Sequence, residues 1–461
     1  MFYAAGMRTP SLPIAALAAV LAAALPGTAA AQTVVPGEVV VRYAEGVDQA
    51  ERADVQRETG VGDPEAFAPH ARRLQITDGE SIAATVRELR DRPEVVSAAP
   101  NPIASIAAIN PRDPGDSGVR GGWRDLQWNF LPDIGISAPD AWQHVLDAGA
   151  RGGRGTTVAV LDTGVAYSGR GRFKRSPDFS RGDFTRGYDF VADDRRPNDE
   201  NGHGTHVAGT IGEKTDNDVA VTGIAYGAKI MPVRVLDRRG DGDSVEIAQG
   251  IRYAARHHAD VINLSFEFHF SISAGDIPEI LAALRYAHRK GALVVAASGN
   301  DREFGDVAVA YPARAPNVVA VGGTTERRCL AEYSNEGHAL DVVAPGGGED
   351  ADLADDPNCR PGVKGRPIVQ MTFARSVRRF KLPRDYVGTS MATPHVSATA
   401  ALVIASGVLG DDPSPHAIEQ RLEATAQDLG PPGVDVRYGA GLVDAAKATD
   451  PAVPRATSSS G

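Results

Sequence analysis

Short apolar runs rich in valine recur through the middle of the chain and are its main structural signal. They occupy residues 156–162, 228–237, 260–266, 291–300, 317–325 and 340–346. Runs this continuous and this short are typical of strands buried on both faces. Stretches with the apolar spacing of amphipathic helices separate some of them, notably residues 244–258 and 277–291, where we expect Ser244 as the N-cap and Gly291 as the stop. Strands that alternate with helices predict a doubly wound, mostly parallel α/β sheet.

Residues 36–100 show a different pattern, which predicts a small separate unit. Strand-like stretches at 37–43, 71–76 and 94–100 alternate with helix-like stretches at 48–60 and 81–93. Ser81 is the expected N-cap of the second helix. The order β-α-β-α-β predicts a ferredoxin-like α+β domain. Residues 100–122 are rich in Pro, Gly, Asn and Asp, and we interpret them as a linker.

The first 31 residues have the features of a secretory signal peptide. Arg8 precedes an apolar run at residues 14–25, and Ala29 and Ala31 give the small-residue pattern of a cleavage site. The run is shorter than the roughly 20 residues that cross a bilayer. We therefore expect export to the extracellular space or the periplasm, with no membrane attachment after signal cleavage.

Charge and cysteine content narrow the choice of partners. The formal net charge is −11, so the composition gives no indication of a basic nucleic-acid-binding face, and it is compatible with bound cations. The two cysteines are Cys329 and Cys359. An even pair in an exported protein favours a disulfide, and two buried free thiols are the alternative.

Three stretches carry residue types suited to acyl transfer: "VAVLDTGV" with Asp162, "NGHGTHVAGT" with His203 and "GTSMATPHVSA" with Ser390. A serine hydroxyl needs a base to take its proton, an imidazole is such a base near neutral pH, and a carboxylate orients the imidazole. Alone, each residue is more often a turn residue, a packed histidine or an N-cap. Together, in the order Asp, His, Ser, they match a known order of catalytic triads.

These stretches resemble the active-site signatures of the subtilisin family of serine peptidases, and the likeness covers residues 125–447. The resemblance implies that Asp162 orients the base, His203 is the general base and Ser390 is the nucleophile. It also implies that Asn300, in "AASGN", donates its amide to the oxyanion together with the Ser390 backbone N–H. Gly388 permits the sharp turn before Ser390. No cofactor is implied for catalysis.

Family members bind peptides as an added strand, and the resemblance places the two edges of that cleft. The residues implied are Ser265 and Phe266 on one edge and Gly240 and Gly242 on the other. The family commonly has Gly-Gly after the first edge, but this chain has Glu267 and Phe268. Two interpretations of Glu267 are open: it favours a basic residue before the scissile bond, or it points to solvent or narrows the pocket.

Structural calcium is a further implication of the resemblance. Asp178 matches a calcium ligand of relatives, and Asn217 or Asp216 lies in the partner loop at residues 214–221, which is one residue longer than usual. Oxygen ligands of this kind suit Ca²⁺. The acidic residues Asp193, Asp194 and Asp199 leave a second ion, a basic substrate residue or a solvated loop as alternatives. His203 and His206 lack the Glu and the spacing of the zinc peptidase motif, so we expect no zinc there.

The resemblance also suggests the domain organisation. Residues 1–31 are the expected signal peptide, 32–109 an inhibitory and chaperoning propeptide, 110–449 the peptidase domain and 450–461 a disordered tail. Self-cleavage is expected between residues 99 and 110. The segment at residues 346–385 is longer than in small relatives, and we expect a surface excursion held to Cys329.

The sequence therefore predicts a secreted, self-processed, monomeric serine endopeptidase that acts on peptides and proteins and is inhibited by its own propeptide. A narrow-specificity processing protease and an inactive binding protein on the same fold remain alternatives. An α/β-hydrolase is disfavoured, because residues 388–392 break the G-x-S-x-G motif and that fold needs the order Ser, acid, His.

Overall fold

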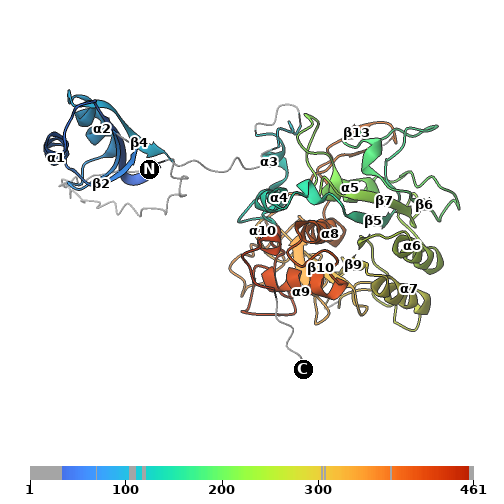
Figure 1. The fold of residues 1–461 in the computed structure, drawn as a ribbon. Coiled ribbons are helices and arrows are strands. Elements are labelled where there is room, and N and C mark those ends of the chain that lie inside the picture. Colours follow the sequence, from blue (N-terminus) through green and yellow to red (C-terminus); the bar gives the residue numbers. More distant parts are fainter. Residues whose placement is uncertain are drawn as a thin grey trace, which may run out of the picture. The chain divides into compact units, whose positions relative to one another are not determined.

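The structure is a computed structural model that describes residues 34–68, 70–102, 111–116, 121–302, 305, 308–373 and 376–455. The chain divides into an N-terminal unit, Met1–Ala107, and a C-terminal unit, Ala108–Gly461 (Figure 1). Among the described residues, no helix is long and apolar enough to cross a membrane. The predicted signal peptide and most of the predicted self-cleavage segment lie outside the described residues.

The N-terminal unit has the predicted ferredoxin-like arrangement, with one strand more than the sequence indicates. Its elements are β1 (Val34–Tyr43), α1 (Gln49–Glu58), β2 (Val61–Ala68), β3 (Ala71–Ile76), α2 (Ile82–Arg90) and β4 (Val95–Pro102). They form an antiparallel sheet in the order β2-β3-β1-β4. Ser81 caps α2 as predicted. The unpredicted β2 is an edge strand, where its Pro64 costs no ladder hydrogen bond.

A seven-stranded parallel sheet forms the centre of the C-terminal unit, in the order β11-β10-β9-β8-β5-β7-β6. Its strands are β5 (Thr157–Asp162), β6 (Tyr188–Asp189), β7 (Lys229–Arg234), β8 (Val261–Leu264), β9 (Leu293–Ala297), β10 (Val319–Thr324) and β11 (Val342–Pro345). The six predicted strands are confirmed. The sequence missed only β6, because a two-residue edge strand leaves no periodic signal.

Helices cover both faces of this sheet (Figure 1). On one side lie α6 (Ser244–Arg256) and α7 (Pro278–Arg289), and on the other α5 (His203–Gly212) and α8 (Thr389–Ser406). Successive residues of β5 alternate between the two cores: Val158 and Val160 pack with α5 and α8, and Leu161 packs with α6 and α7. The remaining helices are α3 (Trp123–Leu126), α4 (Ala138–Asp147), α9 (Pro415–Thr425) and α10 (Ala445–Thr449), with short 3-10 turns η1 (Trp128–Phe130), η2 (Arg151–Gly153) and η3 (Arg181–Asp183).

One predicted cap is wrong and one stop is confirmed. Asp243, not Ser244, caps α6, because its carboxylate accepts the backbone N–H groups of Val245 and Glu246 at 2.8 and 2.9 Å. A carboxylate at this position also suits the positive end of the helix. Gly291 follows the end of α7 with a φ of +85°, a conformation in which glycine is favoured.

One described part of the predicted linker, residues 111–116, packs onto the C-terminal unit. Asp113 is 2% exposed, and its carboxylate accepts the backbone N–H groups of Asp216 and Asn217 at 2.9 and 3.0 Å. Gly115 donates its N–H to the carbonyl of Ala220. The linker interpretation is therefore wrong for this stretch, because buried hydrogen bonds hold it.

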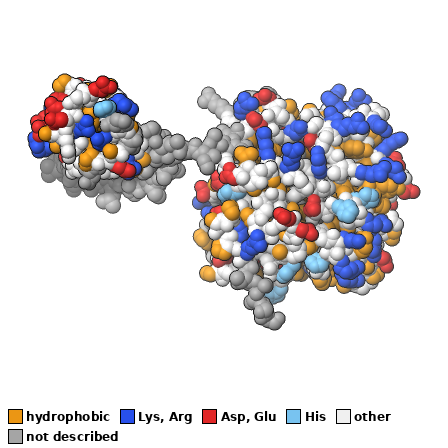
Figure 2. Space-filling view, viewed as in Figure 1, with side chains coloured by type: hydrophobic (Ala, Val, Ile, Leu, Met, Phe, Trp, Pro, Cys, Tyr) orange, Lys and Arg blue, Asp and Glu red, His pale blue; other side chains and the backbone are white. Residues whose placement is uncertain are grey.

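Basic side chains are unevenly distributed over the C-terminal unit. Figure 2 shows Lys and Arg gathered at its upper right, where Figure 1 draws the loops near β6 and the hairpin of β12 (Thr372–Phe373) and β13 (Phe380–Lys381). The net charge of −11 therefore conceals a local concentration of positive charge.

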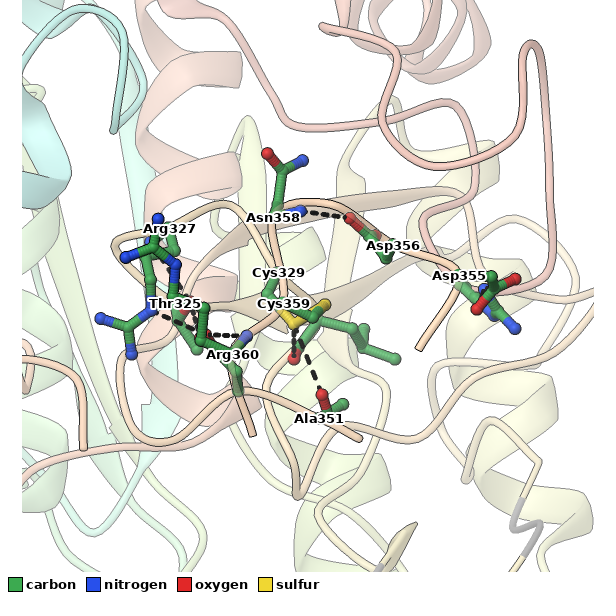
Figure 3. Close-up of a disulfide and its surroundings, with 12 residues drawn as sticks. Thr325, Arg327, Cys329, Ala351, Asp355, Asp356, Asn358, Cys359 and Arg360 are labelled. Carbon is green, nitrogen blue, oxygen red and sulfur yellow. Dashed lines mark hydrogen bonds and ion pairs between the residues drawn. A yellow bond between two sulfur atoms is a disulfide. The ribbon is translucent and has the colours of Figure 1, made fainter. Parts of the chain in front are cut away.

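The segment at residues 346–385 is held by the predicted disulfide. Cys329 and Cys359 are bonded, with their Cα atoms 4.9 Å apart. Arg327 and Arg360 lie near the bond (Figure 3). The carboxylate of Asp350 accepts the side chain of Arg327 at 2.7 Å and the backbone N–H of Arg360 at 2.8 Å. The cross-link thus ties this segment to the turn that follows β10.

Part of that segment is not the surface excursion predicted. Ile368, Val369, Gln370 and Thr372 are at most 3% exposed. The Thr372 hydroxyl donates to the carbonyl of Gly202 at 2.6 Å, so the segment supports the residue that immediately precedes His203. Basic residues on both sides, and the polar side chains of Gln370 and Thr372 within it, disguise the burial of this stretch in the sequence.

Candidate active site

Asp162 and His203 form a hydrogen-bonded pair at the carboxyl edge of the sheet. Asp162 ends β5 and is fully buried, and His203 begins α5 with about a quarter of its side chain exposed. The His203 Nδ1 atom lies 2.9 and 3.0 Å from the two carboxylate oxygens of Asp162. In parallel α/β sheets, functional sites lie beyond this edge. The pairing leaves the Nε2 side of the imidazole free to act on a substrate or a nucleophile.

The electrostatic surroundings favour a protonated His203. Burial alone lowers the pKa of His203, but the charge of Asp162, its hydrogen bond and the charge of Asp199 outweigh burial, so that the pKa is raised. A cationic imidazole arises when a histidine takes the proton of a nucleophile, and an adjacent carboxylate stabilises it.

Asp199 fixes the start of α5 and is not available to a second ion. It is 1% exposed, and it accepts hydrogen bonds from the hydroxyls of Thr163 at 2.9 Å and Thr205 at 2.6 Å. It also accepts the backbone N–H groups of Asn201 and Gly202 at 2.8 and 2.9 Å. All three alternatives, an ion ligand, a substrate contact and a residue of a solvated loop, are therefore wrong for Asp199.

Ser390 is the second residue of α8, after a turn that needs glycine. Gly388 precedes the helix with a φ of +144°. The Asn300 Oδ1 atom accepts the backbone N–H of Thr389 at 2.8 Å and its hydroxyl at 3.0 Å. These bonds place the end of the β9 segment directly beside the start of α8. The first N–H groups of a helix lack partners within it, so that of Ser390 is available as a donor.

Glu267 occupies the donors of Asn300. Its carboxylate accepts the Asn300 backbone N–H at 3.0 and 3.1 Å and the Nδ2 group at 3.1 Å. Burial, followed by the nearby charge of Asp301, raises the pKa of Glu267. The carboxylate thus faces Asn300 and not the solvent. Gly299 leaves room for it, since a Cβ there would lie 2.3 Å from Glu267 Oε2.

The other predicted cleft residues follow the ends of β8 and β7. Ser265 is 1% exposed, and its hydroxyl accepts Asn263 Nδ2 at 2.9 Å inside the core. Phe266 is half-buried. Gly240 and Gly242 follow β7 in an exposed loop. Asn201 Nδ2 donates to the carbonyl of Arg238 at 3.1 Å, so this loop lies beside the segment that leads into His203.

The predicted calcium ligands belong to a buried carboxylate cluster that the sequence analysis found only in part. Asn217 Nδ2 lies 2.8 Å from Asp178 Oδ1, and Asp113 binds the same loop through backbone N–H groups. Glu213, at the end of α5, is fully buried next to Asp178. Asp113 was hidden in a linker-like stretch, and the only signal of Glu213 was a lone acidic residue at the end of an apolar helix.

This cluster combines buried oxygen atoms that lack a described partner with an excess of negative charge. Among the described residues, Asp178 Oδ2 and both carboxylate oxygens of Glu213 are buried without a hydrogen-bond partner. Burial, together with the charges of neighbouring carboxylates, raises the pKa of Asp178 to about 8 and also raises that of Glu213. Buried carboxylates are normally paired, protonated or bound to metal.

His206 packs in the core, away from His203. Its Nε2 atom lies 3.1 Å from the carbonyl of Ile368, and its ring stacks on Tyr386 with centroids 4.2 Å apart. Burial lowers the pKa of His206 to about 3. The two histidines of the "HGTH" stretch thus have different roles, one at the cleft and one in packing.

A parallel α/β sheet with a buried Asp–His pair at its carboxyl edge, and a serine at the start of the helix α8 that packs on α5, indicates the hydrolase class of serine enzymes. Comparison with known proteins then identifies the family. The model described as "Subtilase family" matches residues 153–441, and that described as "Fervidolysin N-terminal prodomain" matches residues 22–101. The chain belongs to the subtilase family and is a subtilisin-like serine protease with an N-terminal prodomain. Subtilases hydrolyse peptide bonds and need no catalytic cofactor.

Individual relatives span both units or the C-terminal unit. A thermophilic serine proteinase from Bacillus sp. (strain AK1) is 33% identical over 408 residues, which cover 88% of this chain and 86% of that protein. Thermitase from Thermoactinomyces vulgaris is 34% identical over 313 residues, 68% of this chain and 93% of that protein. A solved protease structure from Pseudoalteromonas arctica, 30% identical, matches with a TM-score of 0.58 over 74% of this chain and 99% of that chain.

The buried, neutral His206 predicts a specific sensitivity to acid. Its pKa is about 3 in the folded protein and about 6.5 when unfolded. Unfolding therefore takes up a proton between these values, and stability is lost as the pH falls from 6.5 towards 3. The unfolding free energy of the parent protein should fall as the pH is lowered from 6 to 4. In His206→Gln, this fall should be smaller by about 1.4 kcal/mol per pH unit.

Denaturant unfolding in a Ser390→Ala background measures this slope without autolysis. His288→Gln, on α7, is the matched control and should leave the slope unchanged. Equal slopes for His206→Gln and its parent would show that His206 does not control acid stability.

Proposed function

We propose that this chain is a secreted endopeptidase with Asp162, His203 and Ser390 as its catalytic triad and Asn300 as an oxyanion donor. The Asp162–His203 contact is the observation that carries the proposal, because an imidazole held at Nδ1 by a buried carboxylate is the base that a serine nucleophile needs. The hydrogen bonds between Asn300 and Thr389 support it, since they bring the oxyanion segment next to Ser390.

The proposed reaction proceeds through an acyl-enzyme. The Ser390 hydroxyl attacks the peptide carbonyl while His203 Nε2 takes its proton, and Asp162 holds the Nδ1–H in place. The Asn300 amide and the Ser390 backbone N–H then stabilise the negative charge on the carbonyl oxygen. His203 returns the proton to the leaving amine. Water attacks the resulting ester by the same route and restores the serine.

The prodomain gives this activity a maturation step. We infer that residues 1–31 direct export, that residues 32–109 are a propeptide, and that the peptidase domain at residues 110–449 cleaves the chain between residues 99 and 110. The match of a prodomain model to residues 22–101 supports this division. The propeptide is then the enzyme's first substrate and its intramolecular inhibitor.

Ser390→Ala tests catalysis and maturation together. We expect kcat/KM on casein or a peptide to fall by about 10⁶-fold, the loss known for the equivalent change in subtilisin, the family's reference enzyme. Intact mass should show full-length protein in this variant and a shortened chain in the wild type. Asn300→Leu should lower kcat by about 100- to 1000-fold. A Ser390→Ala protein that still matures and cleaves casein would refute the triad.

Glu267 points to restricted specificity, which favours a processing protease over a general degrading one. A carboxylate on the edge of the primary pocket attracts a basic side chain of the substrate. In the structure, that carboxylate also accepts the Asn300 Nδ2 group that the oxyanion needs. A bound Lys or Arg side chain would compete for Glu267 and release the amide, so the preferred substrate would also open the oxyanion site.

Glu267→Gln and Glu267→Gly separate these effects. We expect the ratio of kcat/KM for peptides with Arg and with Leu before the scissile bond to fall at least about 10-fold in both variants, roughly the worth of one desolvated ion pair. Glu267→Gly should also raise kcat on the Leu peptide, because Asn300 is no longer occupied. Unchanged ratios in both variants would exclude Glu267 as a specificity determinant.

We also propose that the cluster of Asp178, Asn217, Asp113 and Glu213 holds a structural Ca²⁺. The partnerless oxygens of Asp178 and Glu213 are the supporting observation. A bound cation would satisfy these oxygens. It would also link the residue 111–116 segment and the residue 214–221 loop to Asp178 and Glu213.

Chelation tests the calcium site. In a Ser390→Ala background, EDTA should lower the melting temperature by about 5 °C or more, and added Ca²⁺ but not Mg²⁺ should restore it. Asp178→Asn should remove most of the response. Asp355→Asn, an exposed carboxylate far along the chain, is the control and should keep it. A melting temperature that EDTA leaves unchanged would argue against the site.

A further inference from the structure

A hollow of about 670 Å³ on the C-terminal unit is lined mainly by arginines. Its wall consists of Arg170, Arg175, Arg181, Arg195 and Arg196, with Tyr167, Ser168, Gly169 and Asn198. The arginines come from the loop after β5, from η3 and from the loop that leads to His203. Neither the proposed catalytic mechanism nor the proposed calcium site uses any of them.

These arginines have no acidic partners among the described residues. None of their guanidinium nitrogens lies within 4.0 Å of a described carboxylate oxygen. The nearby acidic groups are engaged elsewhere. Asp194 accepts the backbone N–H of Arg196 at 2.6 Å, and Glu200 pairs with Arg172. Like charges around one hollow repel each other, and an anion bound there would relieve that repulsion. Guanidinium groups suit carboxylates because their planar N–H forks match the two oxygens.

Asn198 gives the hollow a buried polar group without a partner. It is 3% exposed, and no described group is hydrogen-bonded to its Oδ1 atom. Buried side-chain amides normally have partners. Since the oxygen and nitrogen of an amide are assigned from their surroundings, the Asn198 amide can equally present its NH₂ group to an anion.

The hollow is within reach of a peptide bound at the catalytic pair. Tyr167 lies five residues after Asp162, and Asn198 lies five residues before His203. Five residues span at most about 18 Å when fully extended, which is also about the length of five or six substrate residues. The Val165 N–H donates to the carbonyl of Pro197 at 3.0 Å, so the two loops of the hollow are joined next to the site.

The basic surface continues beyond the hollow. Lys174 donates its backbone N–H to the carbonyl of Val377 at 3.3 Å, which joins the first arginine loop to the β12–β13 hairpin. That hairpin exposes Arg378, Arg379 and Lys381. This region contributes to the concentration of Lys and Arg at the upper right of Figure 2. An extended charged surface fits a chain with several negative groups better than a single small ion.

We propose that this hollow is a remote subsite that binds acidic side chains of a polypeptide substrate, several residues away from the scissile bond. The proposal rests on the proposed peptidase function and adds a second specificity element to it. Substrates would then be selected at two points, by Glu267 next to the scissile bond and by the arginines farther along the chain.

Matched peptides test the subsite in the matured enzyme. The two peptides of a pair share one cleavable core and differ only at four positions, which are all Glu in one peptide and all Gln in the other. These positions lie four to seven residues from the scissile bond. One pair carries them on the amino side of that bond and a second pair on the carboxyl side. At low ionic strength, we expect the Glu peptide to have a KM about 5-fold lower, since each exposed ion pair contributes up to about 1 kcal/mol. The advantage should disappear at 0.5 M NaCl and in Arg175→Gln/Arg196→Gln.

Controls separate the subsite from other causes. Arg285→Gln/Arg289→Gln removes the same charge from α7 and should keep the advantage. An equal advantage in the hollow variant and the wild type would overturn the proposal. The proposal would also be overturned if the wild type cleaved both peptides equally well but its activity changed with inorganic phosphate at constant ionic strength. The hollow would then bind a small anion only. A wild type that neither matures nor cleaves either peptide would refute the proposed function itself.

Discussion

The buried carboxylate of Asp199 is the constraint on which the geometry of the site depends. It accepts hydrogen bonds from Thr163, in the turn after Asp162, and from the backbone at the start of α5. The two segments that carry the Asp–His pair are therefore fixed to each other by this buried carboxylate. Burial raises the pKa of Asp199 against these hydrogen bonds, so the arrangement is stable only while its donors stay in place. Thr372, bonded to Gly202, supports the same junction from a distant segment.

Much of the fold was predictable because its signals are local. Each central strand of the parallel sheet is buried on both faces, so its apolar run is visible without knowledge of its neighbours. The triad stretches were visible for the same reason, since glycines and small residues surround each one. The features that the sequence missed depend on contacts between distant segments. β2 and β6 are edge strands. Asp113 becomes buried only by binding the residue 214–221 loop. Gln370 is buried by tertiary packing, although its side chain is polar.

The charge of the chain illustrates the same limit. A net charge of −11 suggests an acidic surface, yet Asp178, Glu213, Asp162 and Asp199 are all buried. Acidic groups in the interior do not neutralise the arginines that line the hollow. A count of residues cannot distinguish an acidic surface from an acidic interior with a basic patch, because the distinction lies in burial. The calcium proposal and the remote subsite both arise from this separation of charge.

In the proposed mechanism, Glu267 links specificity to catalysis. The Asn300 N–H groups form an anion site that, in the structure, already contains an anion. A hydrogen bond to a charged group contributes about 1.5 to 3 kcal/mol, and the transition state must exchange this bond for one to the oxyanion. If the substrate offers Glu267 no replacement partner, the loss of this bond raises the activation free energy of cleavage. A basic side chain of the substrate provides a new partner and avoids the loss. Differential stabilisation of this kind acts on the transition state more than on binding, so discrimination should appear in kcat as well as in KM. A general degrading protease has no use for such a restraint, whereas an enzyme that must spare most proteins does.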